Sequence, residues 1–139
     1  MKVKIEEFSV STKGRGDIVD LTRVVEQVVS SSGIKNGIVN IFSPGSTVGL
    51  TTMEYEPGLK KDMDIFFDKL APREVYYYHN ETWGDDNGSS HILSSLFKPF
   101  FFFPVIDGKV IRGTWQQVVL LEFDIRSRDR KVIIQVLGE

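Results

Sequence analysis

The sequence predicts an α+β domain, in which two to three helices pack on one face of a mainly antiparallel β-sheet. Predicted strands outnumber predicted helices, and most of the connections between them are short. Asp107-Gly108 lies between two apolar segments and is a strong signal for a β-hairpin. The chain of 139 residues has no internal repeat, low-complexity tract or linker, so we expect a single domain over residues 1–139.

Three strands and one helix are predicted in the first part of the chain. The strand patterns lie at residues 3–11, 37–43 and 47–55. Between the first two strands, apolar residues recur at helical spacing over residues 21–29, and Asp20 or Thr22 can cap this helix. Because the valines in it are poor helix formers, the helix depends on tertiary packing.

Two helices and then four strands are predicted in the rest of the chain. Pro57 can begin the first of these helices, because the first helical residue needs no N–H group, and Pro72 ends it. Its apolar face is predicted to consist of Leu59, Met63, Ile65, Phe66, Phe67 and Leu70. A polar loop from Tyr78 leads to a short helix at residues 91–97. The strands are predicted at residues 99–106, 109–112, 114–123 and 131–137.

Composition and charge exclude several classes of protein. The formal net charge is −2, so no general basic field is expected to recruit nucleic acid. The absence of cysteine excludes disulfides, thiolate zinc sites and cysteine nucleophiles. The N-terminus lacks the apolar segment of a signal peptide, and no segment approaches about 20 apolar residues. We therefore expect a cytoplasmic protein that has neither nucleic acid nor a membrane as a partner.

The only two histidines, His79 and His91, lie in one polar stretch that also contains Asp85, Asp86 and Asn87. Neutral imidazole is a common metal ligand, and its unperturbed pKa is near neutral. The two positions are too far apart for ligands on one helical turn, but a loop that folds back could bring both rings to one ion. Two histidines form an incomplete zinc signal, because zinc sites usually have three or four protein ligands. The alternative is one solvated loop histidine and one histidine at a helix start.

Other polar residues could complete a site. Glu54 could act as a general base or a metal ligand, or it could face solvent from its strand. Residues 43–47 could cradle a phosphate with their backbone N–H groups. Residues 113–117 combine a glycine, a hydroxyl, an indole and two amides, which suits either a cleft or a hydrogen-bonded core. Residues 126–131 form a basic cluster, which could neutralise a phosphate or be a solvated turn.

Several short motifs occur together in this chain. The most specific are Gly113-Thr114-Trp115-Gln116, Glu122-Phe123-Asp124, Arg126-Ser127-Arg128 and Val136-Leu137-Gly138-Glu139. They are accompanied by Ser43-Pro44, by Glu54 with Asp62, and by His79-Asn80 followed by Asn87 and His91. With these motifs the chain resembles the YjbQ family, also known as uncharacterised protein family 0047, over nearly its whole length. The resemblance implies an α+β fold, a homotrimer, and a polar pocket in which three histidines hold a metal, expected to be zinc.

The resemblance leads to a first functional hypothesis. Some members of the family are labelled secondary thiamine-phosphate synthase, which implies a transferase acting on a small phosphorylated molecule. The catalytic residues would be Glu54, His79 and His91, and the two histidines would also be the metal ligands. The residues expected to bind the substrate are Ser46, Thr47, Asn87, Thr114, Gln116 and Arg128.

Two positions depart from the family pattern. After Ser43-Pro44 the family normally has a histidine, whereas this chain has Gly45. The family also usually has an asparagine where this chain has Met53. A three-histidine site therefore cannot form within one subunit, and zinc is expected to bind weakly or not at all. The second functional hypothesis is a non-catalytic small-ligand-binding or assembly module with a degenerate metal site.

Overall fold

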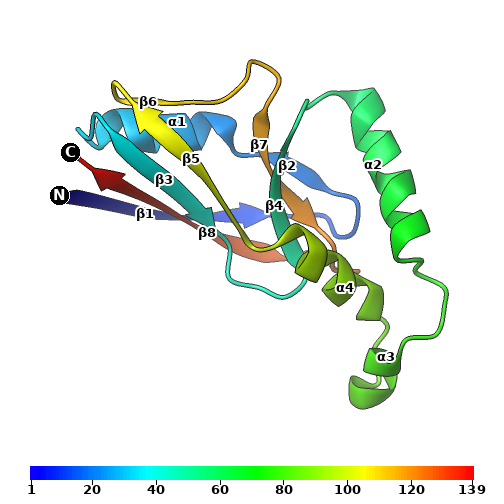
Figure 1. Ribbon diagram of the computed structural model, residues 1–139. Coiled ribbons are helices and arrows are strands. Elements are labelled where there is room, and N and C mark those ends of the chain that lie inside the picture. Colours follow the sequence, from blue (N-terminus) through cyan, green and yellow to red (C-terminus); the bar gives the residue numbers. More distant parts are fainter.

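The computed structural model describes residues 1–139, and it contains eight strands and four helices (Figure 1). The strands are β1 (Lys2–Ser11), β2 (Ile18–Asp20), β3 (Gly37–Phe42), β4 (Val48–Met53), β5 (Phe100–Ile106), β6 (Lys109–Val110), β7 (Gln117–Glu122) and β8 (Asp129–Gly138). The helices are α1 (Thr22–Ser31), α2 (Pro57–Leu70), α3 (Tyr78–Trp83) and α4 (Gly88–Phe97). The predicted α+β class is confirmed.

The strands form two antiparallel sheets rather than the single sheet predicted. The larger sheet has the strand order β1-β8-β3-β5-β6, and the smaller has the order β2-β7-β4. Lys2 pairs with Gly138, so β1 and β8 bring the two ends of the chain to one end of the larger sheet (Figure 1). The predicted hairpin joins β5 to β6, where Asp107 and Gly108 have φ of 51° and 72°. These positive values at both positions are the geometry that Asp-Gly favours.

Strand β7 is buried on both of its faces. Within residues 118–121, the even-numbered side chains pack with Val25 of α1 and with the larger sheet, in the first of two hydrophobic clusters. The odd-numbered side chains pack with Phe67 of α2 and Leu93 of α4, in the second cluster. Helices thus lie on both faces of the smaller sheet, and the prediction that they lie on one face is wrong. A continuous apolar run such as residues 118–121 is typical of a strand covered on both sides.

Helix α2 begins as predicted but buries less than predicted. Pro57 is its first residue, and the carboxylate of Glu56 accepts hydrogen bonds from the N–H groups of Gly58 and Leu59. Of the six apolar residues assigned to its buried face, only Phe67 is buried. The other side chains are partly or largely exposed, including Ile65, Phe66 and Leu70. Phe67 is its main contact, with its ring 5.2 Å from Phe97 and 5.1 Å from Phe123, and Leu59 and Met63 pack against the same cluster.

Two elements were missed or misplaced in the stretch that carries the histidines. Helix α3 occupies residues predicted as loop, and it ends at Gly84, which has a left-handed backbone. Helix α4 begins at Gly88, three residues before the predicted start at His91. Helix α3 buries none of its residues, so it has no apolar periodicity that could reveal it. None of the four helices is long and apolar enough to span a bilayer.

Candidate functional site

The two histidines lie next to each other where α3 meets α4. The ring centroids of His79 and His91 are 4.3 Å apart, and the rings are tilted by 40°. The turn between the helices folds the chain back, and the N–H of Gly88 donates to the side-chain oxygen of Asn80 at 2.9 Å. The chain therefore folds back to place both rings at one point, although their roles as metal ligands or catalysts stay predictions.

Gly88 is required for this close approach of the two helices. A Cβ atom at position 88 would lie 2.7 Å from Cβ of Tyr77 and 2.9 Å from the side-chain oxygen of Asn80. Both distances are shorter than van der Waals contact, so any larger residue would push α4 away from α3. The glycine thus fixes the spacing of the histidine pair.

Asp85 lies beside the ring of His79. Oδ1 of Asp85 lies 3.4 Å from Nδ1 of His79. This distance is longer than a good hydrogen bond. The nitrogen atom is buried and has no hydrogen-bond partner. The amide nitrogen of Asn87, turned toward Asp85, donates to the two carboxylate oxygens at 3.1 and 3.3 Å. A carboxylate beside Nδ1 leaves Nε2 of His79 as the nitrogen available to a ligand.

His91 is held in its neutral form. Burial lowers the pKa of His91 below its usual value of 6.5, and the neighbouring His79 lowers it further. The carboxylates of Asp124 and Asp85 and a hydrogen bond to the backbone of Ser46 oppose this shift without cancelling it. A neutral imidazole can accept a proton or bind a metal at neutral pH.

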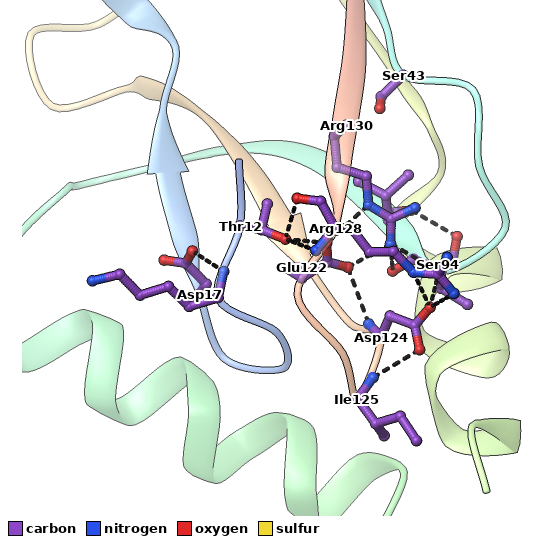
Figure 2. A network of polar contacts seen from close by, with 12 residues as sticks. Thr12, Asp17, Ser43, Ser94, Glu122, Asp124, Ile125, Arg128 and Arg130 are labelled. Carbon is purple, nitrogen blue, oxygen red and sulfur yellow. Dashed lines mark hydrogen bonds and ion pairs between the residues drawn. The ribbon is translucent and has the colours of Figure 1, made fainter. Parts of the chain in front are cut away.

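Asp124 is a fixed anion beneath the histidine pair. Its side chain is fully buried, and it accepts hydrogen bonds from Nε of Arg128 at 2.8 Å and from the hydroxyl of Thr47 at 3.3 Å (Figure 2). Burial by itself would raise the pKa of Asp124, but the hydrogen bond and charge of Arg128 outweigh it, so the pKa is lowered. The carboxylate therefore stays ionised and supports the protonated form of a nearby imidazole.

A buried ion pair between Glu122 and Arg130 lies beside Asp124. Glu122 accepts hydrogen bonds from Nε of Arg130 at 2.8 Å and from the hydroxyl of Thr12 at 2.6 Å (Figure 2). Nη2 of Arg130 also donates to the backbone and hydroxyl oxygens of Thr47, at 3.1 and 2.8 Å. The interpretation of residues 126–131 as a solvated turn is wrong for Arg130, which is only 7% exposed. These contacts fix the start of β4 to β7 and β8.

The structure brings together only part of the predicted site. Around the histidine pair lie Ser46, Thr47, Asn87 and Arg128, through the contacts described above. Three other predicted residues lie at the opposite end of β4: Glu54, Thr114 and Gln116. Gln116 donates to the hydroxyl of Thr52 at 3.3 Å, and Glu54 is exposed just beyond the end of the strand. A six-residue strand spans about 17 Å, so the histidines and Glu54 do not share a pocket within one chain.

A cavity of about 360 Å³ opens beside the histidines. Besides His79 and His91 it is lined by Tyr76, Tyr77, Tyr78, Gly88, Ile92 and Ser95. The three consecutive tyrosines were not recognised as part of the site, although their run in the sequence could have indicated an aromatic wall. A hollow of about 410 Å³ beside Lys60 and Lys61 is somewhat larger, but it contains no histidine. The chemistry of the imidazoles therefore identifies the smaller cavity as the candidate site.

The metal-ligating side chains of this site form an incomplete set. No group of three His, Cys, Asp or Glu side chains is arranged to hold a metal ion in this chain. Two imidazoles would leave two positions of a tetrahedral zinc ion to other ligands. The donor set fits a metal only with additional ligands from solvent, substrate or another chain.

Comparisons with known proteins agree with the motifs. Residues 6–139 match the family model described as "UPF0047 protein YjbQ-like". A UPF0047 protein of Methanothermobacter thermautotrophicus is 34% identical over 139 residues, which cover 100% of this chain and 95% of the relative. A UPF0047 protein of Archaeoglobus fulgidus is 36% identical over 131 residues, 94% of this chain and 99% of the relative.

Solved structures show the same fold. A YbjQ-like protein of unknown function from Sulfolobus solfataricus has a TM-score of 0.88 and 35% identity, with 99% of this chain and 100% of that chain covered. A hypothetical protein from Aeropyrum pernix has a TM-score of 0.85 and 30% identity, with 96% and 99% covered. The match of the family model over nearly the whole sequence and the shared fold lead to one conclusion: the chain belongs to the YjbQ-like UPF0047 family.

Proposed function

We propose that this protein binds a small phosphorylated molecule in the cavity beside His79 and His91 and promotes proton transfer at it. Such chemistry would be a weak activity of the thiamine-phosphate synthase type. The observation that carries the proposal is the 4.3 Å contact between the two rings at one wall of that cavity. Because the pKa of His91 is lowered, its imidazole is neutral at neutral pH and can accept a proton from a bound molecule.

We also propose that the two imidazoles bind zinc weakly. Each ring has an oxygen acceptor near one nitrogen: the carboxylate of Asp85 for His79, and the backbone of Ser46 for His91. Metal-bound histidines usually have such a partner, which leaves the other nitrogen for the metal. With two protein ligands instead of three, we expect a lower affinity than in a three-histidine site.

Calorimetric titration of the metal-free protein with zinc tests the histidine pocket. The proposal requires one saturable site and a loss of affinity of about tenfold or more in each of His79→Ala and His91→Ala, because each removes half of the protein ligands. Asp86→Asn is a suitable control, since Asp86 is an exposed carboxylate in the same segment. Zinc binding that survives both histidine substitutions would place the metal elsewhere.

A non-catalytic binding or assembly module is the second candidate. It is favoured by the position of Glu54 at the far end of β4, which leaves the histidine cavity without that predicted general base. An activity assay with a pyrophosphate-bearing pyrimidine and a phosphorylated acceptor separates the two candidates. Saturable binding of these compounds without product would support the binding module.

We propose that the chain assembles as a homotrimer through the outer face of the larger sheet. The register places apolar side chains of neighbouring strands side by side on this face, such as Val3, Leu137 and Ile38. Its exposed members include Val3 at 54%, Ile38 at 46% and Phe102 at 60%. Monomeric proteins rarely expose a large contiguous apolar patch, whereas a repeated contact between copies can close into a ring.

Light scattering at micromolar concentration tests the assembly. We expect a mass of three chains for the parent protein and a smaller mass for Phe102→Glu, which places a charge in the proposed contact. Ile65→Glu is the control, because Ile65 is 56% exposed but lies on α2. A monomeric parent protein would contradict the proposal.

A further inference from the structure

We propose that Gly45 opens a subsite for an oxyanion, such as a phosphate group, at the buried guanidinium of Arg130. The inference deepens the proposed function, because it supposes that the ligand beside the histidines carries an anionic group. The sequence placed Arg130 only within the basic cluster of residues 126–131, and the residues expected to bind the substrate were Arg128, Ser46 and Thr47 instead.

The guanidinium of Arg130 has one nitrogen left for a ligand. Its Nε and Nη2 donate to the carboxylate of Glu122 and to Thr47, and these contacts hold the side chain in place. Nη1 donates no hydrogen bond within the chain, and it is not among the buried polar atoms without a partner. This nitrogen therefore retains access to solvent while the rest of the side chain is enclosed.

The space in front of Nη1 exists because residue 45 has no side chain. A Cβ atom at position 45 would lie 3.0 Å from Nη1 of Arg130 and 3.1 Å from Cγ1 of Val48. Gly45 is exposed, and its φ is not positive, so its backbone conformation does not require glycine. The absence of a side chain thus keeps a path open from solvent to a fixed cationic donor.

This donor lies close to the histidine pair. Gly45 precedes Ser46, whose backbone lies beside the ring of His91. Consecutive Cα atoms are about 3.8 Å apart, so an oxyanion on Nη1 would be within reach of a ligand that also contacts His91. The same small molecule can therefore place its anionic group on Arg130 and its reacting group at the imidazoles.

Two of the groups that the sequence suggested for phosphate already donate to a carboxylate. The hydroxyl of Thr47 donates to Asp124, and Nε of Arg128 donates to the same carboxylate. Arg130 Nη1 needs no rearrangement, and a guanidinium fixed by Glu122 loses no side-chain entropy when an anion binds. Because Glu122 offsets the charge of Arg130, binding depends on the directed N–H groups and is modest for a free anion.

Titration of the metal-free protein with inorganic phosphate at constant ionic strength tests the subsite. We expect saturable shifts of the backbone amides of Gly45 and Ser46 and of the Arg130 side-chain resonances, which chloride at equal ionic strength does not cause. Gly45→Ala should weaken phosphate binding by about tenfold, the value of one charge-assisted hydrogen bond. Unchanged phosphate affinity in Gly45→Ala, or shifts confined to other residues, would overturn the inference.

Two controls keep this result separate from the proposed function. Gly58→Ala also brings a Cβ atom to within 3.2 Å of a charged side chain, that of Glu56, but at the start of α2, so it should bind phosphate like the parent protein. Zinc titration of the same samples reports on the histidines alone. If the protein binds zinc but Gly45→Ala does not change the phosphate affinity, the histidine site is supported and the subsite is contradicted. If Gly45→Ala weakens phosphate binding but the protein binds no zinc, the subsite is supported and the metal site is contradicted.

Discussion

The two ends of β4 differ in how they hold their polar side chains. At the first end, Thr47 and Asp124 belong to a network whose members are buried except for Arg128. Glu122 and Arg130, which form an ion pair in it, are 1% and 7% exposed. At the second end, Glu54 and Gln116 are exposed. Fixed, desolvated groups can bind and orient a ligand, whereas exposed groups must first be ordered. We therefore place the functional site at the first end.

The second end can contribute to the histidine site only from another copy of the chain. Within one chain, the length of β4 separates Glu54 from the imidazoles. The exposed Trp115 beside it, at 70% exposure, is compatible with a surface that contacts another chain. The following predictions test the contrast between the two ends, from the largest expected effect to the smallest.

Substitution of Arg130 should have the largest effect on stability. Arg130→Met leaves the carboxylate of Glu122 buried without its cation, and we expect a loss of about 3–5 kcal/mol in the free energy of unfolding. Glu54→Gln, at the exposed end, should change it by less than about 0.5 kcal/mol. Urea unfolding at one protein concentration measures both. Equal effects of the two substitutions would show that the ends of β4 do not differ as described.

Leu93 should be the next most sensitive position. It is fully buried and fastens α4 to the smaller sheet, so Leu93→Ala should cost about 2–5 kcal/mol. The same change should broaden the NMR signals of His91, which lies on the same helix. Leu96→Ala is the control, because Leu96 lies on α4 but is 57% exposed. A stable Leu93→Ala protein with unchanged histidine signals would mean that α4 is positioned by other contacts.

The acid stability of the protein should depend on Asp124. Its pKa is lowered in the folded state from the usual 3.8, so it contributes stability above that value, and this contribution is lost as the pH falls through the folded pKa. We expect Asp124→Asn to show a smaller loss of unfolding free energy than the parent protein between pH 6 and pH 3. Asp62→Asn, on an exposed residue of α2, serves as the comparison. A parallel pH dependence in the parent and Asp124→Asn would contradict the assignment.

The smallest predicted effect is on the titration of His91. In metal-free protein its pKa should lie below 6.5, and His79→Asn should raise it, because the neighbouring imidazolium charge is removed. NMR signals of the imidazole Cε1–H group measure this directly. A pKa of His91 that does not respond to His79→Asn would mean that the two rings are farther apart in solution.

The sequence predicts the strands better than it predicts the site. The hairpin at Asp107-Gly108 and the apolar strands follow from local patterns, and both are present. Helix α3 carries no apolar periodicity, since none of its residues is buried. In the sequence, Arg130 looks like one more charge in a basic turn, because its burial depends on Glu122 and Thr47, which are distant along the chain. The burial of Arg130 therefore cannot be predicted from the residues next to it in the sequence.

The position of Glu54 illustrates the same limit. The number of residues between Glu54 and the histidines does not show that they lie at opposite ends of β4. The meeting of His79 and His91 was predicted from the resemblance to the family, not from their spacing. In the sequence, Gly45 matters because it replaces a histidine of the family pattern. In the structure, it also lies beside Nη1 of Arg130, which has no hydrogen-bond partner within the chain.

The central claim is that His79 and His91 form one ligand site that does not need Glu54. Long-range ¹H–¹⁵N NMR spectra of the imidazoles, recorded during a zinc titration, test it most directly. Our account predicts that a nitrogen of each ring shifts together and saturates at the same zinc concentration, in the parent protein and in Glu54→Gln alike. A response of only one ring, or its loss in Glu54→Gln, would contradict it.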